Sequence, residues 1–400
     1  MVKGANVSSR TVFEIDESDI ERLDLCPVCS GEKYCALSRV CCKNILFLET
    51  RFCNHCGLVY RGIRPKIEWF IKSWRYRDRL QVDGRCRYRP SMVVEKNRSE
   101  RYEILKVFLE NIITGRSLID IGTGTGYGLA SFLDGSWDVT GVEADSSRSR
   151  IGKQKFGLEI FECTIEGLAC ADKKYDIATM VHSLEHFHDP KGIIKLLKSF
   201  LKNSGYIYVE VPELLNSDKC WQDSLHLAHM CNFSEYNLLL LGSEAGLIPI
   251  YRTYPKSSDF GAKNLGVLFQ LSNAGSQMNI EKHGNKVINK EYDDVLTLYL
   301  KGLPKICHTP VEYVVHEIND MSVLFKLTEV IHSQYKFLRS ERIPVYSPTD
   351  KKVYLVFPGR FVRAKLVIKN ALASLVVILR RMLQRYDTEF HNMIYHKFPQ

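Results

Sequence analysis

Four alternating glycines follow an apolar segment that ends in an aspartate, a pattern typical of a loop that binds a nucleotide. The motif comprises Asp120, Gly122, Gly124, Gly126 and Gly128. Glycine lets a backbone approach a ligand closely, and a helix expected from Leu129 would aim free N–H groups at the same ligand. Glu143 ends the next expected strand, where a carboxylate can accept hydrogen bonds from both hydroxyls of a ribose. A tight turn without a ligand is the alternative, although four such glycines are costly in unfolded-state entropy.

The spacing of these glycines separates two classes of nucleotide cofactor. The dinucleotide fingerprint G-x-G-x-x-G needs a third glycine where Tyr127 or Leu129 stands. The order found, D-x-G-x-G-x-G, resembles the first motif of the class I S-adenosylmethionine (SAM) methyltransferases. The resemblance implies that SAM is the cofactor, that Asp120 and the first three glycines line it, and that Glu143 holds its ribose. The expected cofactor site also includes residues that follow the second, third and fourth strands, namely Ala144, Thr164, Ile165 and His182.

Two C-x-x-C pairs near the N-terminus have the spacing of a metal site. Their members are Cys26, Cys29, Cys53 and Cys56, with 23 residues between the pairs. Four thiolates suit tetrahedral Zn²⁺ and leave no position open for water, so the expected role of zinc is structural. Two redox-active dithiols, or cysteines that only pack in a core, are the alternatives. The first residues lack a hydrophobic export signal, so we expect a cytoplasmic protein with reduced cysteines.

The central part of the chain alternates between expected strands and helices. Strands are expected to end at Asp120 and near Glu143, and further strands at Leu158–Cys163, Tyr175–Val181, Tyr206–Val211, Ile248–Tyr254 and Gly266–Leu271, with helices at Glu100–Glu110 and Ser234–Ala245. This alternation predicts a parallel α/β sheet that binds its ligand at the carboxyl ends of the strands. The expected fold is therefore α/β, with a Rossmann-like seven-stranded methyltransferase sheet, an N-terminal zinc ribbon and a mainly helical C-terminal region.

Motifs after the fourth and fifth strands narrow the resemblance. Leu184-Glu-His186 with Asp189-Pro190 resembles the fourth-strand motif of small-molecule O- and C-methyltransferases. Together with the C-x-x-C pairs, the motifs at 211–213, 226–234 and 244–247 resemble zinc-ribbon methyltransferases of bacterial sugar and surface-polysaccharide pathways. This resemblance covers about residues 21–272. It implies a small-molecule or glycan acceptor that is methylated on a hydroxyl or carbon of a sugar or nucleotide-sugar.

Three histidines are candidates for removing the acceptor's proton, which methyl transfer to a hydroxyl or carbon acid requires. His186 follows the fourth strand on the side where an acceptor would meet the methyl group. It is the first candidate for the general base, because histidine titrates near neutral pH. His226 and His229 are second candidates, from the loop expected to cover the acceptor. A structural role through hydrogen bonding is the alternative for His186 and His229.

Excess positive charge is concentrated just before the expected catalytic domain. The formal net charge is +9, and residues 61–101 hold thirteen Lys/Arg against five Asp/Glu, interspersed with aromatic residues. Such a segment can bind RNA or the phosphates of a nucleotide-sugar or lipid carrier, or it can be a solvated connector. A zinc-ribbon RNA base methyltransferase is therefore the alternative function, although residues 182–185 replace the Asn/Asp-Pro-Pro-aromatic motif of base amino-group methyltransferases. A non-enzymatic interaction protein is the third hypothesis.

Composition divides the 400 residues into five expected regions. They are a flexible N-terminus (1–20), a zinc-ribbon module (21–62), a basic connector (63–100), a SAM-dependent methyltransferase domain (101–273) and a mainly helical region (274–400). In the last region, helices are expected at 289–303, 313–337 and 361–383, and a short strand at 353–357. The chain has no apolar run of about 18 residues, so no membrane span is expected. The basic-flanked helix at 361–383 could instead lie on a membrane surface or pack as a cap.

Overall fold

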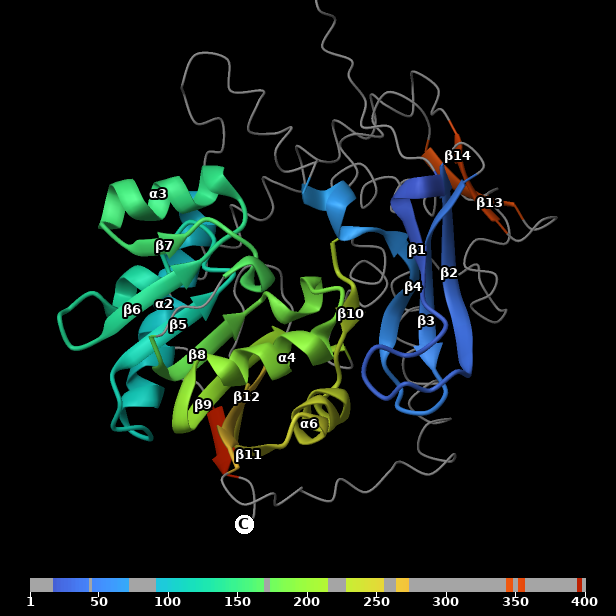
Figure 1. Cartoon of the computed structure of the whole chain (residues 1–400). Coiled ribbons are helices and arrows are strands. Elements are labelled where there is room, and N and C mark those ends of the chain that lie inside the picture. The colour runs from blue at the N-terminus through green and yellow to red at the C-terminus, as the bar shows by residue number, and fades with distance from the viewer. Residues whose placement is uncertain are drawn as a thin grey trace, which may run out of the picture.

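The computed structural model describes residues 17–42, 45–71, 91–168, 173–214, 228–254, 264–272, 343–347, 352–356 and 394–397. They form an N-terminal antiparallel sheet, a larger α/β unit and a C-terminal hairpin (Figure 1). Several expected features lie outside these residues: most of the flexible N-terminus (1–16), much of the basic connector (72–90), His226, and the helices at 289–303, 313–337 and 361–383.

The N-terminal sheet carries the two C-x-x-C pairs, and we call residues 17–71 the N-terminal module. Its elements are η1 (Glu17–Asp19), β1 (Ile20–Arg22), β2 (Tyr34–Cys42), β3 (Ile45–Cys53) and β4 (Val59–Pro65). The strand order is β1-β4-β3-β2, with antiparallel pairing throughout. Strands β2 and β3 form an antiparallel hairpin between the two C-x-x-C pairs.

The larger sheet has eight strands in the order β15-β11-β12-β9-β8-β5-β6-β7. The strands are β5 (Ser117–Ile121), β6 (Asp138–Val142), β7 (Glu159–Phe161), β8 (Tyr175–Val181), β9 (Leu201–Pro212), β11 (Leu247–Tyr254), β12 (Asn264–Leu271) and β15 (Ile394–Lys397). The expectation of a wholly parallel sheet is wrong, because β12 runs antiparallel to β9 and β11. Only nine residues join β11 to β12, fewer than the dozen or so that a parallel crossover needs. The eighth strand, β15, was not expected; it extends the sheet by pairing with β11.

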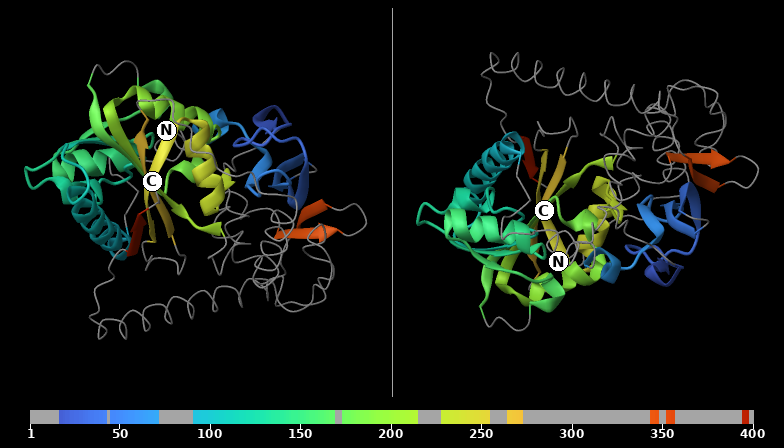
Figure 2. Two further views of the ribbon diagram at one scale, coloured as in Figure 1. Left: turned by 90° about the horizontal axis from the view of Figure 1, so that it is seen from below. Right: turned by 90° about the horizontal axis from the view of Figure 1, so that it is seen from above.

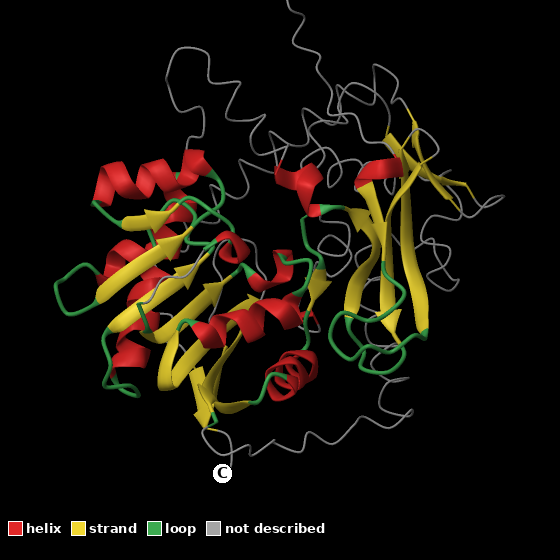
Figure 3. Ribbon diagram, in the orientation of Figure 1, coloured by secondary structure: helices red, strands yellow, loops and turns green. Residues whose placement is uncertain are grey.

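Helices cover both faces of this sheet (Figure 3). They are α2 (Met92–Glu110), η2 (Leu129–Phe132), α3 (Ser146–Phe156), η3 (Ile165–Gly167), η4 (Leu184–His186), α4 (Pro190–Ser199) and α6 (Glu235–Glu244). Side chains alternate along a strand, so neighbours enter different cores. Leu118 belongs to the core that contains Leu105 of α2, whereas Ile119 belongs to the core that contains Leu197 of α4 and Leu241 of α6.

The N-terminal module and the α/β unit share one core and one stretch of sheet. The short strand β10 (Cys231–Asn232) leaves the α/β unit and pairs with β4, with Cys231 opposite Tyr60. Buried Phe52 and Val59 of the module belong to the same hydrophobic cluster as Phe233 and Leu241. In Figure 1, β10 lies between the two sheets. Met230, which directly precedes β10, is hydrogen-bonded to Arg61 of the module and to Glu185 of the α/β unit.

The strands that the structure describes after residue 340 lie against both sheets. The hairpin of β13 (Ile343–Ser347) and β14 (Lys352–Val356) lies beside the strands of the N-terminal module in both views of Figure 2. Strand β14 matches the expected strand at 353–357, shifted by one residue. Among the helices that the structure describes, none is long and apolar enough to cross a membrane.

Candidate active site

The glycine loop follows β5, and three of its glycines adopt a backbone conformation that L-residues rarely take. The φ angles of Gly122, Gly124 and Gly126 are 78°, 61° and 77°. The loop is also crowded: a Cβ on Gly126 would lie 2.7 Å from Cδ1 of Leu158, and one on Gly122 would lie 2.7 Å from Cβ of Ser183. Only glycine fits such positions without strain or displacement of a neighbour. The loop is thus shaped by its packing against neighbouring elements as well as by its own sequence.

The helix expected after this loop is only one short turn. Residues Leu129–Phe132 form the 3₁₀ helix η2, and Gly135 then takes a φ of 87° before the chain enters β6. The helix therefore begins at Leu129, as expected, but it is a single 3₁₀ turn.

Glu143 follows β6, and its side chain is hydrogen-bonded to the glycine loop. Its Oε2 accepts a hydrogen bond from the Gly124 N–H at 2.8 Å, and its Oε1 accepts one from the Asp145 N–H at 2.8 Å. The residue is 9% exposed, and burial raises the pKa of its carboxyl above the usual value. An ionised carboxylate offers about four acceptor positions. These two contacts use two of the acceptor positions, and the contact of Glu143 with the hydroxyls of a ribose stays a prediction.

Asp120 lies beneath the loop and ties three elements together. Its Oδ1 accepts a hydrogen bond from Oγ1 of Thr179 on β8 at 2.7 Å, and both its oxygens lie 3.2 Å from the Tyr102 hydroxyl of α2. It is 1% exposed, and burial raises its pKa to about 6. In this structure Asp120 links the end of β5, where the loop begins, to α2 and β8. Its contact with SAM stays a prediction.

The remaining predicted cofactor residues line the same edge of the sheet. Ala144 follows β6, and Thr164 caps η3 just after β7, where its Oγ1 accepts a hydrogen bond from the Gly167 N–H at 3.3 Å. Ile165 is 2% exposed, and His182 directly follows β8. The carboxyl ends of β5, β6, β7 and β8 therefore bring together every residue predicted to bind SAM.

Two residues of α2 that sequence reasoning missed also reach the glycine loop. The carboxylate of Glu95, which is 1% exposed, accepts hydrogen bonds from Thr125 Oγ1 and Arg98 Nη1, both at 2.8 Å. Arg98 Nη1 also lies 3.6 Å from the position that a Cβ on Gly124 would occupy. The only sequence signal for these two residues was their spacing, since Glu95 and Arg98 lie three residues apart in a helix. Such acid–base pairs are common on solvated helices, so the spacing does not indicate a site.

His182 lies between two buried carboxylates. Its Nδ1 is 3.6 Å from Glu185 Oε1, and its Nε2 is 3.6 Å from Glu210 Oε1. Burial and nearby Arg101 lower the pKa of His182, but the two carboxylates outweigh them, so its pKa lies above the ordinary value. The residue has a φ of 54°, a conformation that costs a non-glycine residue energy and is often kept at functional sites.

His186 and His229 face each other across the carboxyl ends of the strands. Their ring centroids are 4.9 Å apart, and Nδ1 of His186 is 2.8 Å from the Ala228 carbonyl oxygen. Nε2 of His186 is 4.0 Å from Oε1 of Glu185, a carboxylate that is 2% exposed and has no hydrogen-bond donor within range among the described residues. Burial raises the pKa of Glu185, but His182 and His186 outweigh burial and hold it below the usual value.

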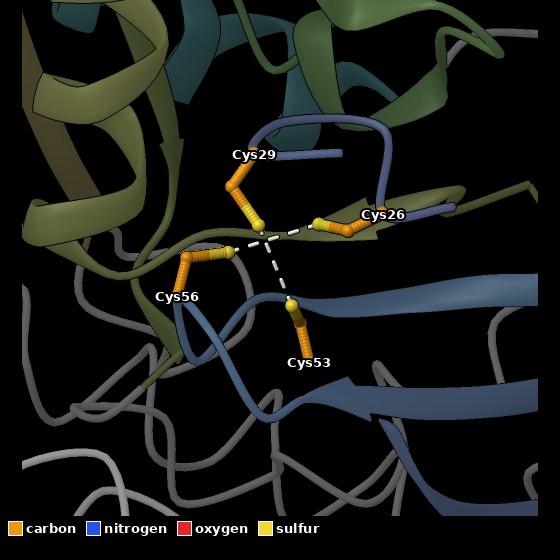
Figure 4. Close-up of side chains that lie close together, drawn as sticks. All are labelled: Cys26, Cys29, Cys53 and Cys56. Carbon is orange, nitrogen blue, oxygen red and sulfur yellow. Dashed lines mark hydrogen bonds between the residues drawn. The ribbon is translucent and has the colours of Figure 1, made fainter. Parts of the chain in front are cut away.

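The four cysteines of the C-x-x-C pairs converge on one point. Figure 4 shows their thiol groups pointing toward one another from two turns of the N-terminal module. Sγ of Cys26 is 3.7 Å from Sγ of Cys56, and Sγ of Cys29 is 3.6 Å from Sγ of Cys53. A disulfide needs about 2.05 Å, so these are free thiols. Zinc–sulfur bonds of about 2.3 Å in a tetrahedron place the sulfurs about 3.8 Å apart, which these distances match.

Part of the chain is similar to known proteins. A family model described as a methyltransferase domain matches residues 94–250. The chain is 30% identical over 109 residues to the ubiquinone biosynthesis O-methyltransferase of Haemophilus ducreyi, an alignment that covers 25% of this chain and 46% of that protein. It is 31% identical over 102 residues to the enzyme of the same name from Stutzerimonas stutzeri, covering 24% of this chain and 44% of that protein. The chain thus spans about half the length of these curated relatives.

A solved structure of a SAM-dependent methyltransferase from Thermotoga maritima, described as a possible histamine N-methyltransferase, is 21% identical to this chain. The match has a TM-score of 0.37 and covers 45% of this chain and 92% of that one. The family match spans the elements from α2 to β11, which include the glycine loop, Glu143 and the histidines after β8. Residues 94–250 therefore match a methyltransferase domain.

Proposed function

We propose that the protein transfers the methyl group of SAM to a hydroxyl of a sugar, nucleotide-sugar or glycan, and that His186 accepts the hydroxyl proton. The tautomer of His186 carries this proposal. The Ala228 carbonyl can only accept a hydrogen bond, so a neutral His186 must place its proton on Nδ1. Nε2 then carries the lone pair of the neutral ring, and a general base accepts a proton on such a lone pair.

SAM supplies a methyl group on a positively charged sulfur. The glycine loop and Glu143 would hold its nucleoside. Nε2 of His186 would take the proton of the acceptor hydroxyl as the acceptor oxygen bonds to the methyl carbon and the carbon–sulfur bond breaks. The buried carboxylate of Glu185, 4.0 Å from that nitrogen, stabilises the imidazolium that forms.

A hydroxyl acceptor is favoured over a carbon acceptor by the relatives, which are named O-methyltransferases. The saccharide class rests on the resemblance of the loop motifs and the C-x-x-C pairs to sugar and surface-polysaccharide methyltransferases.

We also propose that Cys26, Cys29, Cys53 and Cys56 hold one structural Zn²⁺. Support comes from the match between the sulfur–sulfur distances and the edge of a tetrahedral site. Four thiolates would fill the coordination sphere, so the ion would stabilise the N-terminal module without meeting the substrate.

The RNA alternative draws on the basic segment at 61–101, but the described part of that segment offers few free charges. Arg61 and Arg64 are 1% and 3% exposed. Arg98 and Arg101 form ion pairs with Glu95 and Glu210. These four side chains are therefore poorly placed for phosphates. If RNA binding does occur, it should weaken steeply as salt rises.

Product analysis tests the proposal. Purified protein is incubated with SAM carrying a deuterated methyl group and with a panel of nucleotide-sugars and extracted glycans, and the products are examined by mass spectrometry and NMR. The proposal expects a deuterated methyl ether on a saccharide. A labelled carbon, a labelled RNA base in a parallel incubation, or no labelled saccharide from the panel would each contradict it.

A further inference from the structure

A buried arginine of the N-terminal module contacts the histidines of the candidate active site through the backbone. Arg61 lies on β4 and is 1% exposed. Its Nε donates a hydrogen bond to the His229 carbonyl at 3.1 Å, and its backbone N–H donates one to the Met230 carbonyl at 2.8 Å. Its Nη1 donates to Oγ1 of Thr50 on the neighbouring strand β3. The guanidinium thus bridges the module and the chain segment 228–231.

The opposite side of this segment holds the catalytic residues. The Ala228 carbonyl accepts the hydrogen bond from Nδ1 of His186, and the Met230 N–H donates to the Glu185 carbonyl at 2.7 Å. The peptide whose carbonyl contacts Arg61 is thus adjacent to the one whose carbonyl fixes the ring of His186. A shift of either carbonyl would move the His186 ring and its neighbour His229.

Placing a guanidinium where water cannot reach it is costly unless its donors are satisfied. A hydrophobic residue at position 61 could fill the same interface without that cost. Arginine differs from such a residue, and from lysine, in its rigid set of donors. The Nε–H in particular reaches a carbonyl that a lysine ammonium cannot contact in the same geometry.

We infer that Arg61 is a positioning residue, which holds segment 228–231 so that His186 and His229 meet the methyl acceptor. The inference rests on the proposed function for the role of His186. The N-terminal module is then a part of the acceptor site. Disturbing Arg61 should lower turnover and leave SAM affinity intact.

The test compares Arg61→Lys with Arg64→Lys. Arg64 is the matched control, because it is also a buried arginine of β4 that crosses the interface, where its Nη2 donates to the His188 carbonyl at 2.9 Å. Arg61→Lys should lower kcat about 10- to 100-fold, the scale expected for a misplaced catalytic group. Arg64→Lys should leave kcat near the wild-type value, and both variants should bind SAM as the wild type does.

Hydrogen exchange supplies a readout that needs no acceptor. A peptide covering residues 228–234 should exchange faster in Arg61→Lys than in Arg64→Lys, because the His229 carbonyl loses the Arg61 donor that holds the segment in place. In a His186→Ala background, Arg61→Lys should reduce turnover no further, since both changes act through one group. Thr50→Val, which removes the hydroxyl partner of the guanidinium, serves as a milder variant if Arg61→Lys does not fold.

Equal exchange and equal kcat in the two lysine variants would overturn the inference. So would a fall in SAM affinity that matches the fall in turnover, or a further loss of turnover in the His186→Ala background. Failure of the proposed function is distinguishable, because a protein that methylates no acceptor can still show the exchange difference.

Discussion

The carboxylate of Glu143 accepts a hydrogen bond at 2.8 Å from the backbone N–H of Gly124, a residue 19 positions earlier in the chain. The group expected to hold the ribose therefore also fixes the middle of the loop expected to lie under the cofactor. One side chain therefore contributes both to the conformation of the loop and to the expected ribose site. Because Gly124 has positive φ, this N–H is directed by a backbone state that few other residues could maintain.

Replacing Glu143 should weaken SAM binding more than it weakens the fold. Glu143→Gln keeps the size of the side chain but removes the charge that strengthens hydrogen bonds to ribose hydroxyls. Hydrogen bonds to a charged group contribute about 1.5–3 kcal/mol, so SAM affinity should fall by at least about 10-fold. Calorimetric titration measures this change. Glu159→Gln, at the exposed amino end of β7, is the control and should bind SAM normally; equal affinities in the two variants would refute the assignment.

Asp120 should make stability depend on pH in a window set by its raised pKa. The folded-state pKa of about 6 exceeds the ordinary value of 3.8, so the folded protein binds more protons than the unfolded chain between these values. Stability therefore falls as pH rises from about 4 to about 6, and the cost stays constant above that window. Asp120→Asn removes this titration while retaining an acceptor for Thr179. The variant should gain up to about 3 kcal/mol in unfolding free energy relative to wild type across the window.

Denaturant unfolding of both proteins at a series of pH values checks this expectation. The relevant quantity is the difference in unfolding free energy between variant and wild type. A difference that does not change between pH 4 and pH 7 would show that Asp120 does not titrate as described.

The steric effect of a side chain at position 126 can be measured separately from the cost of the positive φ angle there. Gly126 and Gly135 both have positive φ, at 77° and 87°, but a Cβ on Gly135 would meet open space. Gly135→Ala should cost about 1–2 kcal/mol of stability, the ordinary penalty of the left-handed region. Gly126→Ala should cost more and also weaken SAM binding, because its Cβ would lie 3.0 Å from Cα of Gly152. Equal thermal midpoints and SAM affinities in the two variants would show that the loop tolerates a side chain.

Local chemistry made several elements of this fold predictable from sequence. Strand β8 has the expected limits, because its apolar run is bounded by polar residues on both sides. Helix α6 begins after Ser234, whose side chain and that of Asn237 form a capping box, and Gly246 with a φ of 71° follows its end. These features depend on a few neighbouring residues, and the sequence displays them directly.

Features that depend on distant pairing were not predictable. Nothing in Cys231 or Asn232 indicates that they pair with β4, some 170 residues earlier. The same holds for β15, which extends the sheet beside β11, and for Glu95, which reaches Thr125 of the glycine loop. Sequence patterns indicated which residues are candidates for catalysis or for ligand binding. The contacts that position them come from elements brought together only in the folded chain.

The metal proposal predicts one zinc ion per chain and a dependence on each cysteine of the cluster. Cys53→Ser should lose the zinc and lower the thermal midpoint, because the metal joins two turns of the N-terminal module. Elemental analysis of purified protein measures the metal content. Cys163→Ser is the control, since Cys163 is a free cysteine outside the cluster. Full zinc content in Cys53→Ser, or none in the wild type, would contradict the proposal.

Turnover of His186→Ala, measured with and without added imidazole, tests the proposed chemistry most directly. The account predicts a fall of about 10²- to 10⁴-fold in kcat, the range for a lost general base, with SAM affinity unchanged. Free imidazole should restore part of the turnover by supplying the missing proton acceptor. Wild-type turnover in the variant, or a loss that imidazole leaves untouched, would show that His186 takes no proton from the acceptor.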